Sequence, residues 1–218
     1  MTENSRITYL TAAVFLFVLQ ILIVFRNIVS NKYMNFFWFC DFAPTLLAVA
    51  FLLKEEQLIK AIINIGLAAQ LIVSILLIIG FTFHIDIIGT AKSLSYGKFY
   101  VTIELMIHLF PINFAFLLTR KKRPELRSLI YSFFVLAIMF ILSRAFTDSE
   151  SNINYVFALF GMSFPIYLFF PIWIMMLFLI LSLPNYLLQH YFTDGHFDKK
   201  TLQKEYNYVR NKVSFILR

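Results

Sequence analysis

The sequence predicts an all-α integral membrane protein with six transmembrane helices around a polar cavity. Of its 218 residues, 60% are hydrophobic and 14% are charged, whereas about 25% of the residues in a soluble domain are charged. The apolar residues gather in six stretches, each near the length of about 20 residues that a helix needs to cross a bilayer. Because lipid offers no hydrogen bonds to the backbone, we expect these spans to be helices and not strands.

The six predicted spans are joined by short charged connectors and by two longer ones. The spans cover residues 7–25, 35–53, 58–79, 99–119, 129–146 and 164–183. Each is close to the roughly 17–25 residues that a tilted helix needs. The longer connectors, 81–98 and 147–163, retain apolar residues, so we expect them to fold back onto the membrane or to cap a cavity. Residues 1–195 thus form one predicted transmembrane domain.

The remaining residues, 196–218, are predicted to form a basic amphipathic tail. Apolar residues recur there at helical spacings of four and three, with lysines and arginines between them. These apolar residues are Leu202, Tyr206, Val209, Val213 and Ile216. Such a helix is suited to lie on an anionic inner leaflet. The alternative is that it packs against its own bundle.

The distribution of basic residues predicts that both termini are cytoplasmic. With the N-terminus inside, 14 of the 19 lysines and arginines fall in inner connectors or in the tail, as the positive-inside rule requires. Arg26 and Arg144 are among the five that this topology places outside. The basic run at 120–123 is interpreted as a topology anchor, and the net charge of +7 requires no nucleic-acid partner. The predicted partners are membrane lipids, and the oligomeric state is left open.

The candidate chemistry lies where Cys40 on the second span and His108 on the fourth reach a similar depth. Both spans descend from the outer face, and the two residues lie about five and about nine residues along them, roughly 8 and 13 Å at the rise of a helix. A thiolate beside an imidazole is an acyl-transfer arrangement, with the thiolate as nucleophile and the imidazole as base. We therefore expect the two side chains to lie within one hydrogen bond or one bridging water.

Further polar residues are predicted to support this pair. Glu104 lies one turn above His108 on the same helix face and could orient it, as the third group of a catalytic triad does. Asp41 follows Cys40 directly. On the third span, Gln70 and Ser74 continue a stripe of small and polar residues, so we expect them to line the cavity.

The segment 36–44, with the sequence FFWFCDFAP, resembles the Leu-Cys-Asp signature in the second span of the YwaF-like integral membrane proteins. That family includes an animal phospholipid acyltransferase with a Cys/His site. The resemblance extends to His108 in mid-helix and to Asn154-Tyr155 before the last span, and it implies that Cys40 is the acyl-accepting nucleophile and His108 its base. The family's Pro-Leu-His lead-in to the cysteine is replaced here by Phe37-Trp38-Phe39. More distantly, the androgen-induced membrane hydrolases use threonine with histidine on a similar six-helix plan.

The favoured function is acyl transfer or ester hydrolysis on a membrane lipid. One alternative is a small-solute transporter or substrate-binding membrane subunit, whose solute site Asp41, Gln70, Glu104 and His108 would line. A second alternative is a structural subunit in which the polar stripes only join helices. No cofactor is expected, because a single cysteine provides neither a CxxC redox pair nor a thiolate metal cluster.

Several other residues have more than one interpretation. Arg144 could pair with Asp41 or with a lipid phosphate, or it could be a snorkelling anchor. Asn154 and Tyr155 could close over the cavity or belong to an interfacial aromatic belt. His84 and Asp86 lie two apart, but a third ligand is not evident, so we predict a solvated loop and no metal site. His190 and His196 are expected at the surface.

Overall fold

The computed structural model describes residues 3–87, 90–158, 165–194 and 207, and every regular element in this part of the chain is helical. The long helices are α1 (Glu3–Val29), α2 (Phe39–Leu53), α3 (Glu56–Phe83), α5 (Lys98–Leu109), α6 (Pro111–Thr119), α7 (Leu126–Phe146), α8 (Ile166–Leu177) and α9 (Leu183–Asp194). The short ones are η1 (Tyr33–Phe37), α4 (Thr90–Ser95), η2 (Ile153–Tyr155) and the π-helical turn η3 (Phe178–Ser182). The all-α prediction is confirmed for the described residues.

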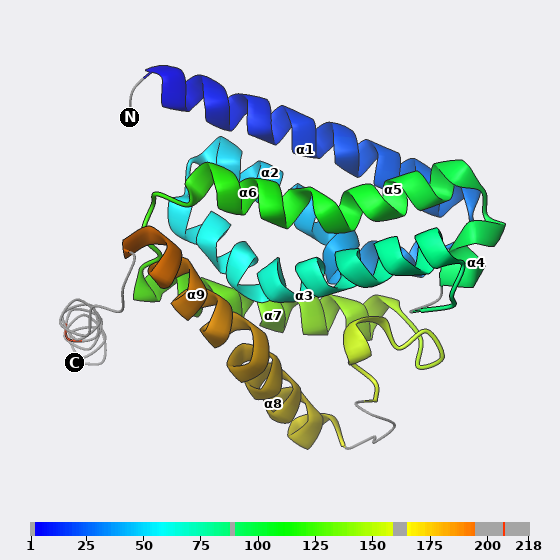
Figure 1. The fold of residues 1–218 in the computed structure, drawn as a ribbon. Coiled ribbons are helices and arrows are strands. Elements are labelled where there is room, and N and C mark those ends of the chain that lie inside the picture. Colours follow the sequence, from blue (N-terminus) through cyan, green and yellow to red (C-terminus); the bar gives the residue numbers. More distant parts are fainter. Residues whose placement is uncertain (1–2, 88–89, 159–164, 195–206, 208–218) are drawn as a thin grey trace.

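The centre of the bundle is α3. It contacts α2, α5, α6, α7 and α9, while α1 packs along α2 and reaches α5 (Figure 1). Small residues make the contact between α1 and α2 close, because Ala12, Ala13, Ala43 and Ala48 are all fully buried there. The α8–α9 rod lies obliquely to the rest of the bundle (Figure 1). The polar side chains that are buried at the two ends of this bundle come mainly from α1, α2, α3, α5, α7 and α9.

Five helical segments are long and apolar enough to cross a membrane. They are Arg6–Val29, Glu56–Phe83, Lys98–Thr119, Leu126–Phe146 and Ile166–Thr193. Large hydrophobic side chains remain exposed along them, as lipid contact requires. These helices support the prediction of an integral membrane protein. Six full spans are not confirmed, because α2 has only 15 residues.

The predicted second span is shorter because the helix is broken at its beginning. Residues 33–37 form a 3₁₀ turn, and Trp38 has an extended conformation (ψ 137°) before α2 starts. The side chain of Asn154 bridges this break. Its Nδ2 donates to the carbonyl of Phe37 (2.5 Å), and the N–H of Phe39 donates to its Oδ1 (3.0 Å). A remote amide thus satisfies backbone groups that a continuous helix would have paired internally.

Other helix boundaries also differ from the predictions. The first helix continues to Val29, so Arg26 lies inside it and not in a loop. The fourth span is interrupted at Phe110, because Pro111 lacks the N–H that would continue the ladder. The last helix continues to Asp194 through the π turn. That turn lies just before Pro184, which cannot bond the carbonyl four residues earlier.

The predicted tail helix lies outside the described residues, with the exception of residue 207. The structure therefore does not test its amphipathic character, its predicted contact with an anionic leaflet, or the boundary between residues 195 and 196.

Candidate functional site: a buried ionic cluster

Arg26 is the centre of a buried set of charged side chains. Its side chain is 2% exposed. Nη2 lies 2.6 Å from Asp41 Oδ2, and Nη1 pairs with the carboxylate of Glu104. Asn27 completes the set, since its Oδ1 accepts from Arg26 and its Nδ2 donates to Asp41 Oδ2 (2.8 Å). One guanidinium thus joins three helices, α1, α2 and α5.

Helix ends bring these groups to one end of the bundle. Arg26 lies in the last turn of α1, and Asp41 lies in the first turn of α2. Both positions agree with the helix macrodipole, which favours a cation near a C-terminus and an anion near an N-terminus. Glu104 lies in the second turn of α5, which packs on α1.

His108 extends the set further into the bundle. Its Nδ1 lies 2.6 Å from Oε1 of Gln70 on α3, and its Nε2 lies 3.6 Å from Oε1 of Glu104. The roles of the two ring nitrogens depend on the tautomer of His108. When Nδ1 donates to the amide oxygen of Gln70, Nε2 is the nitrogen that can gain and lose a proton. Nε2 faces Glu104, so the adjacent carboxylate can stabilise the protonated form. We call Arg26, Asn27, Asp41, Gln70, Glu104 and His108 the ionic cluster.

Cys40 lies at the edge of the ionic cluster. Its Sγ hydrogen-bonds Asp41 Oδ1 at 3.8 Å, and its side chain packs beside the buried group of Leu19, Ile23, Ile103 and Ile107. The structure has no direct hydrogen bond between Cys40 and His108. The two are linked only through Asp41, Arg26 and Glu104. Their action on a common substrate stays a prediction.

The charges of the ionic cluster do not balance while His108 is neutral. Two carboxylates, Asp41 and Glu104, face one guanidinium. Protonation of His108 would bring the sum to zero. A further cation lies at the edge of the cluster, where Lys32 Nζ donates to the hydroxyl of Tyr100 (2.8 Å), whose ring centre is 5.2 Å from the carbon of the guanidinium.

Sequence reasoning missed Arg26 and Asn27. The sequence predicts that the first span ends at residue 25, which places Arg26 in a loop. The signal that could have found it is the pair of intramembrane carboxylates, Asp41 and Glu104, which require a cationic partner. Arg144 was considered for that role, but its Nη1 donates to the carbonyl of Val156 (3.1 Å), and its guanidinium lies over the ring of Phe157.

Three other predicted site residues make contacts that join or stabilise helices. Asn154 bridges the break before α2, and the ring of Tyr155 meets the ring of Trp38 edge-on, with the ring centres 6.0 Å apart. Ser74 Oγ donates to the carbonyl of Gln70 on its own helix (2.6 Å). The predicted stripe of small and polar residues on α3 does not face an open space along its whole length. At Gly66, one turn before Gln70, an added Cβ would lie 2.9 Å from the ring of Phe39.

A cavity of about 300 Å³ lies between α1, η1, α2 and α7. It is mainly apolar and is lined by Gln20, Val24, Phe36, Phe37, Phe42, Thr45, Met139 and Leu142. Three of these phenylalanines flank Cys40 in the sequence, but neither Cys40 nor His108 lines the cavity. The amide oxygen of Gln20 is buried there and has no hydrogen-bond partner among the residues that the structure describes. The predicted polar cavity around the Cys40–His108 pair is thus not confirmed.

A second polar group lies at the opposite end of the bundle. Asn64 Nδ2 lies 3.3 Å from the hydroxyls of both Ser128 and Ser132, and its backbone and side-chain oxygens accept from Asn185 and Gln189. We call these five residues the amide cluster. They connect α3, α7 and α9.

His190 adjoins the amide cluster. It is buried, at 2% exposure, and its Nδ1 accepts from Arg123 Nε. The expectation that His190 lies at the surface is therefore wrong, because α9 continues past the predicted end of the span and packs on α3. His196 lies outside the described residues.

Within the described part of the chain, no group of three or more His, Cys, Asp or Glu side chains could hold a metal ion. His84 forms the left-handed C-cap of α3. Neither a protein-family model, nor a characterised protein, nor a solved structure matches this chain. The resemblance to the YwaF-like proteins stays a prediction.

Proposed function

We propose that the ionic cluster is the acid–base centre of a membrane-embedded enzyme that transfers or hydrolyses an acyl group of a membrane lipid. Cys40 is the nucleophile and His108 is the base. The observation that carries this proposal is the 2.6 Å contact of Gln70 Oε1 with His108 Nδ1. With Nδ1 donating to this amide oxygen, Nε2 is the nitrogen that exchanges a proton, and it faces Glu104 of the ionic cluster, at whose edge the only thiol of the chain lies.

The chemistry begins with the thiol proton. His108 Nε2 takes it through a bridging water or after a closer approach of α2 and α5, since catalytic hydrogen bonds are often long in an empty site. The thiolate attacks the ester carbonyl, the acyl carbon–oxygen bond breaks, and the leaving alcohol takes the proton from His108. The resulting thioester on Cys40 is then attacked by water or by an acceptor hydroxyl, whose proton passes to His108 before the thiol is released.

Glu104 has a defined part in this sequence. Its Oε1 lies 3.6 Å from Nε2, close enough to stabilise the imidazolium that forms when His108 is protonated. Its second oxygen is held by Arg26, so the carboxylate cannot rotate away without breaking a buried ion pair. Glu104 is a positioning residue in this scheme.

The apolar cavity supports a lipid as the substrate class. Its volume of about 300 Å³ is at the lower end of the range for ligand pockets, roughly 300–1,000 Å³. Its lining is largely aromatic and aliphatic, and Phe37 and Phe42 lie within three residues of Cys40. An acyl chain in this cavity would have its carboxyl end near the first turn of α2.

The second candidate function is a proton-linked solute site. The observation in its favour is that two buried carboxylates share one guanidinium, so that protonation of His108 brings the summed charge of the ionic cluster to zero. Ionisable groups in this arrangement are also used in proton relays of transporters. In that case the thiol of Cys40 has no chemical role.

Intact-mass measurement tests the two functions against each other. The purified protein is incubated with phospholipid vesicles, and we expect a mass increase of one acyl group that hydroxylamine removes. Cys40→Ser should carry no adduct and should lose lipid turnover, and His108→Gln should lose turnover as well. If neither an adduct nor turnover is found and Cys40→Ser leaves pH-dependent solute uptake unchanged, acyl transfer is excluded in favour of the second candidate.

A further inference from the structure

From a hollow at the opposite end of the bundle, we infer a binding site for the headgroup of an anionic phospholipid. The hollow has a volume of about 520 Å³ and lies between the end of α6 and the end of α9. It is lined by Phe116, Leu117, Arg120, Lys121, Phe192 and Thr193. This site is independent of the ionic cluster and of the proposed acyl transfer.

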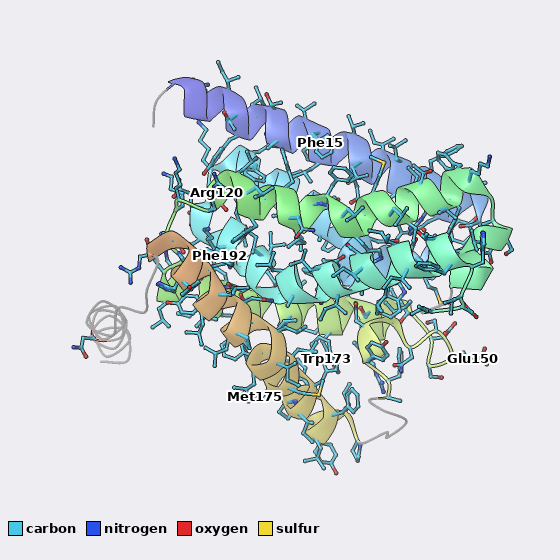
Figure 2. All side chains as sticks on the ribbon, in the orientation of Figure 1. Phe15, Arg120, Glu150, Trp173, Met175 and Phe192 are labelled. Atoms are coloured by element: carbon cyan, nitrogen blue, oxygen red, sulfur yellow. The ribbon has the colours of Figure 1, made fainter. Side chains whose placement is uncertain are left out.

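The walls of the hollow are fixed to each other. Thr193 Oγ1 lies 3.0 Å from the carbonyl oxygen of Arg120 and 2.9 Å from that of Gln189, so its one hydroxyl hydrogen is shared between them and attaches the last turn of α9 to the end of α6. Phe116 and Phe192 meet edge-to-face with their ring centres 5.5 Å apart. Arg120 and Phe192 lie close to this end of α9 (Figure 2). The hollow therefore has an aromatic floor and a basic rim.

The rim cations differ from their neighbours in the basic run. Lys122 Nζ pairs with Glu56 at 3.0 Å, and Arg127 Nε pairs with Glu125 at 3.1 Å. Arg120 and Lys121, in contrast, are exposed and have no ion-pair partner among the residues that the structure describes. The run is thus not only a topology anchor. Arg120 and Lys121 can therefore bind an external anion without first breaking an ion pair within the described part of the protein.

The apolar floor makes a phospholipid the better match than a free phosphate ion. Leu117 and Phe192 are each 57% exposed, and they extend the apolar floor of the hollow along the exposed sides of α6 and α9. A phosphate ion could use only the cations. A phospholipid could place its phosphate between Arg120 and Lys121 and its acyl chains along this floor, as basic pockets between transmembrane helices do.

Native mass spectrometry of the full chain in detergent tests this site. We expect phosphatidylglycerol to bind more tightly than phosphatidylcholine, with one lipid at the high-affinity position. Because each basic residue near the headgroup contributes to binding, the double variant Arg120→Gln/Lys121→Gln should weaken binding of phosphatidylglycerol by about tenfold or more. The double variant Lys122→Gln/Arg127→Gln removes the same two charges from ion-paired residues and is the matched control, with an expected change of less than about twofold.

Three results would overturn the inference. Equal losses in Lys122→Gln/Arg127→Gln and in Arg120→Gln/Lys121→Gln would mean that only net charge matters. Competition by inorganic phosphate, with no loss in Phe192→Ser, would mean that the site takes a free anion. A dimer mass that disappears in Phe192→Ser would mean that a second copy of the chain covers the hollow. Lipid turnover should be unchanged in all these variants, so a failure here is separate from a failure of the proposed acyl transfer.

Discussion

The two polar clusters at the ends of the bundle are built from different chemistry. The amide cluster is neutral, and its amides and hydroxyls hydrogen-bond one another and backbone carbonyls across α3, α7 and α9. The ionic cluster has two carboxylates for one guanidinium and a histidine whose ring nitrogens face Gln70 and Glu104. Neutral pairs are a common means of joining membrane helices, whereas buried charges are costly there and mark functional sites.

Lys60 and Arg26, the buried cations at the two ends of the bundle, differ in their partners. Lys60 is fully buried near the amide cluster, but its Nζ donates to the carbonyl of Thr119 (2.8 Å) and not to a carboxylate. Thr119 is the last residue of α6, and its carbonyl also accepts from the N–H of Lys122 (2.8 Å). The C-terminal end of a helix favours a cation through the helix dipole. This lysine thus closes a helix end, while Arg26 neutralises two acids. The comparison teaches that buried charge alone does not identify a site, and that the partners of the charge decide.

The largest effect should follow from removing the guanidinium of the ionic cluster. Arg26→Met leaves Asp41 and Glu104 buried without their cation, so we expect a loss of about 3–5 kcal/mol in the free energy of unfolding. Unfolding in mixed micelles measures this. Arg120→Met removes an exposed arginine and should cost less than about 1 kcal/mol. Equal stability of the two variants would mean that Arg26 does not stabilise the fold by neutralising Asp41 and Glu104.

The bridge before α2 should give the next largest effect. Asn154→Ala removes the acceptor of the Phe39 N–H and leaves the carbonyl of Phe37 with only its longer bond from Ser143 Oγ (3.4 Å). We expect a loss of about 2 kcal/mol and lower lipid turnover, because the first turn of α2 carries Cys40. Asn154→Asp keeps the acceptor for Phe39 but loses the donors, so its effect should be intermediate. Full turnover in Asn154→Ala would show that the bridge does not position the thiol.

Much of the helical layout was predictable, because long apolar stretches leave few other structures in lipid. Helix ends and breaks were less predictable, since distant residues decide them. Nothing local to residues 35–38 indicates that Asn154 will replace their helical hydrogen bonds. Likewise, the apolar stretch before Arg26 ends at residue 25, yet the helix continues because Asp41 and Glu104 bind the arginine from other helices.

The polar residues of the site were predictable in kind but not in their pairing. Asp41, Gln70, Glu104 and His108 were selected because polar groups are rare in apolar spans, and the structure places all four in one cluster. Their partners depend on helix rotation, which the pattern of a single span does not determine. The i, i+4 spacing of Glu104 and His108 could be read directly, whereas the contact of His108 with Gln70 joins residues 38 positions apart.

The amide cluster should tolerate change better than the ionic cluster. Asn64→Leu removes hydrogen bonds to Ser128, Ser132 and Gln189, and each of these three side chains also bonds a backbone carbonyl. Since interhelical hydrogen bonds in membranes average about 0.6 kcal/mol and reach at most about 1.7, we expect a loss of about 1–2 kcal/mol. Lipid turnover per folded molecule should be unchanged. A drop in turnover at unchanged stability would show that the two ends of the bundle are coupled.

The smallest effect is expected at Ser74, which lies one turn from Gln70 in the same predicted stripe. Its hydroxyl bonds the carbonyl of Gln70 within α3. That carbonyl is also the helical acceptor for the N–H of Ser74, so Ser74→Ala should leave it paired and change the free energy of unfolding by less than about 0.5 kcal/mol. Gln70→Leu is the contrasting variant, because it removes the acceptor at His108 Nδ1 and should abolish most of the turnover. If Ser74→Ala also lowers turnover strongly at unchanged stability, Ser74 lines the substrate path as the sequence predicts, and the role given to Gln70 alone has to be shared with the rest of the stripe.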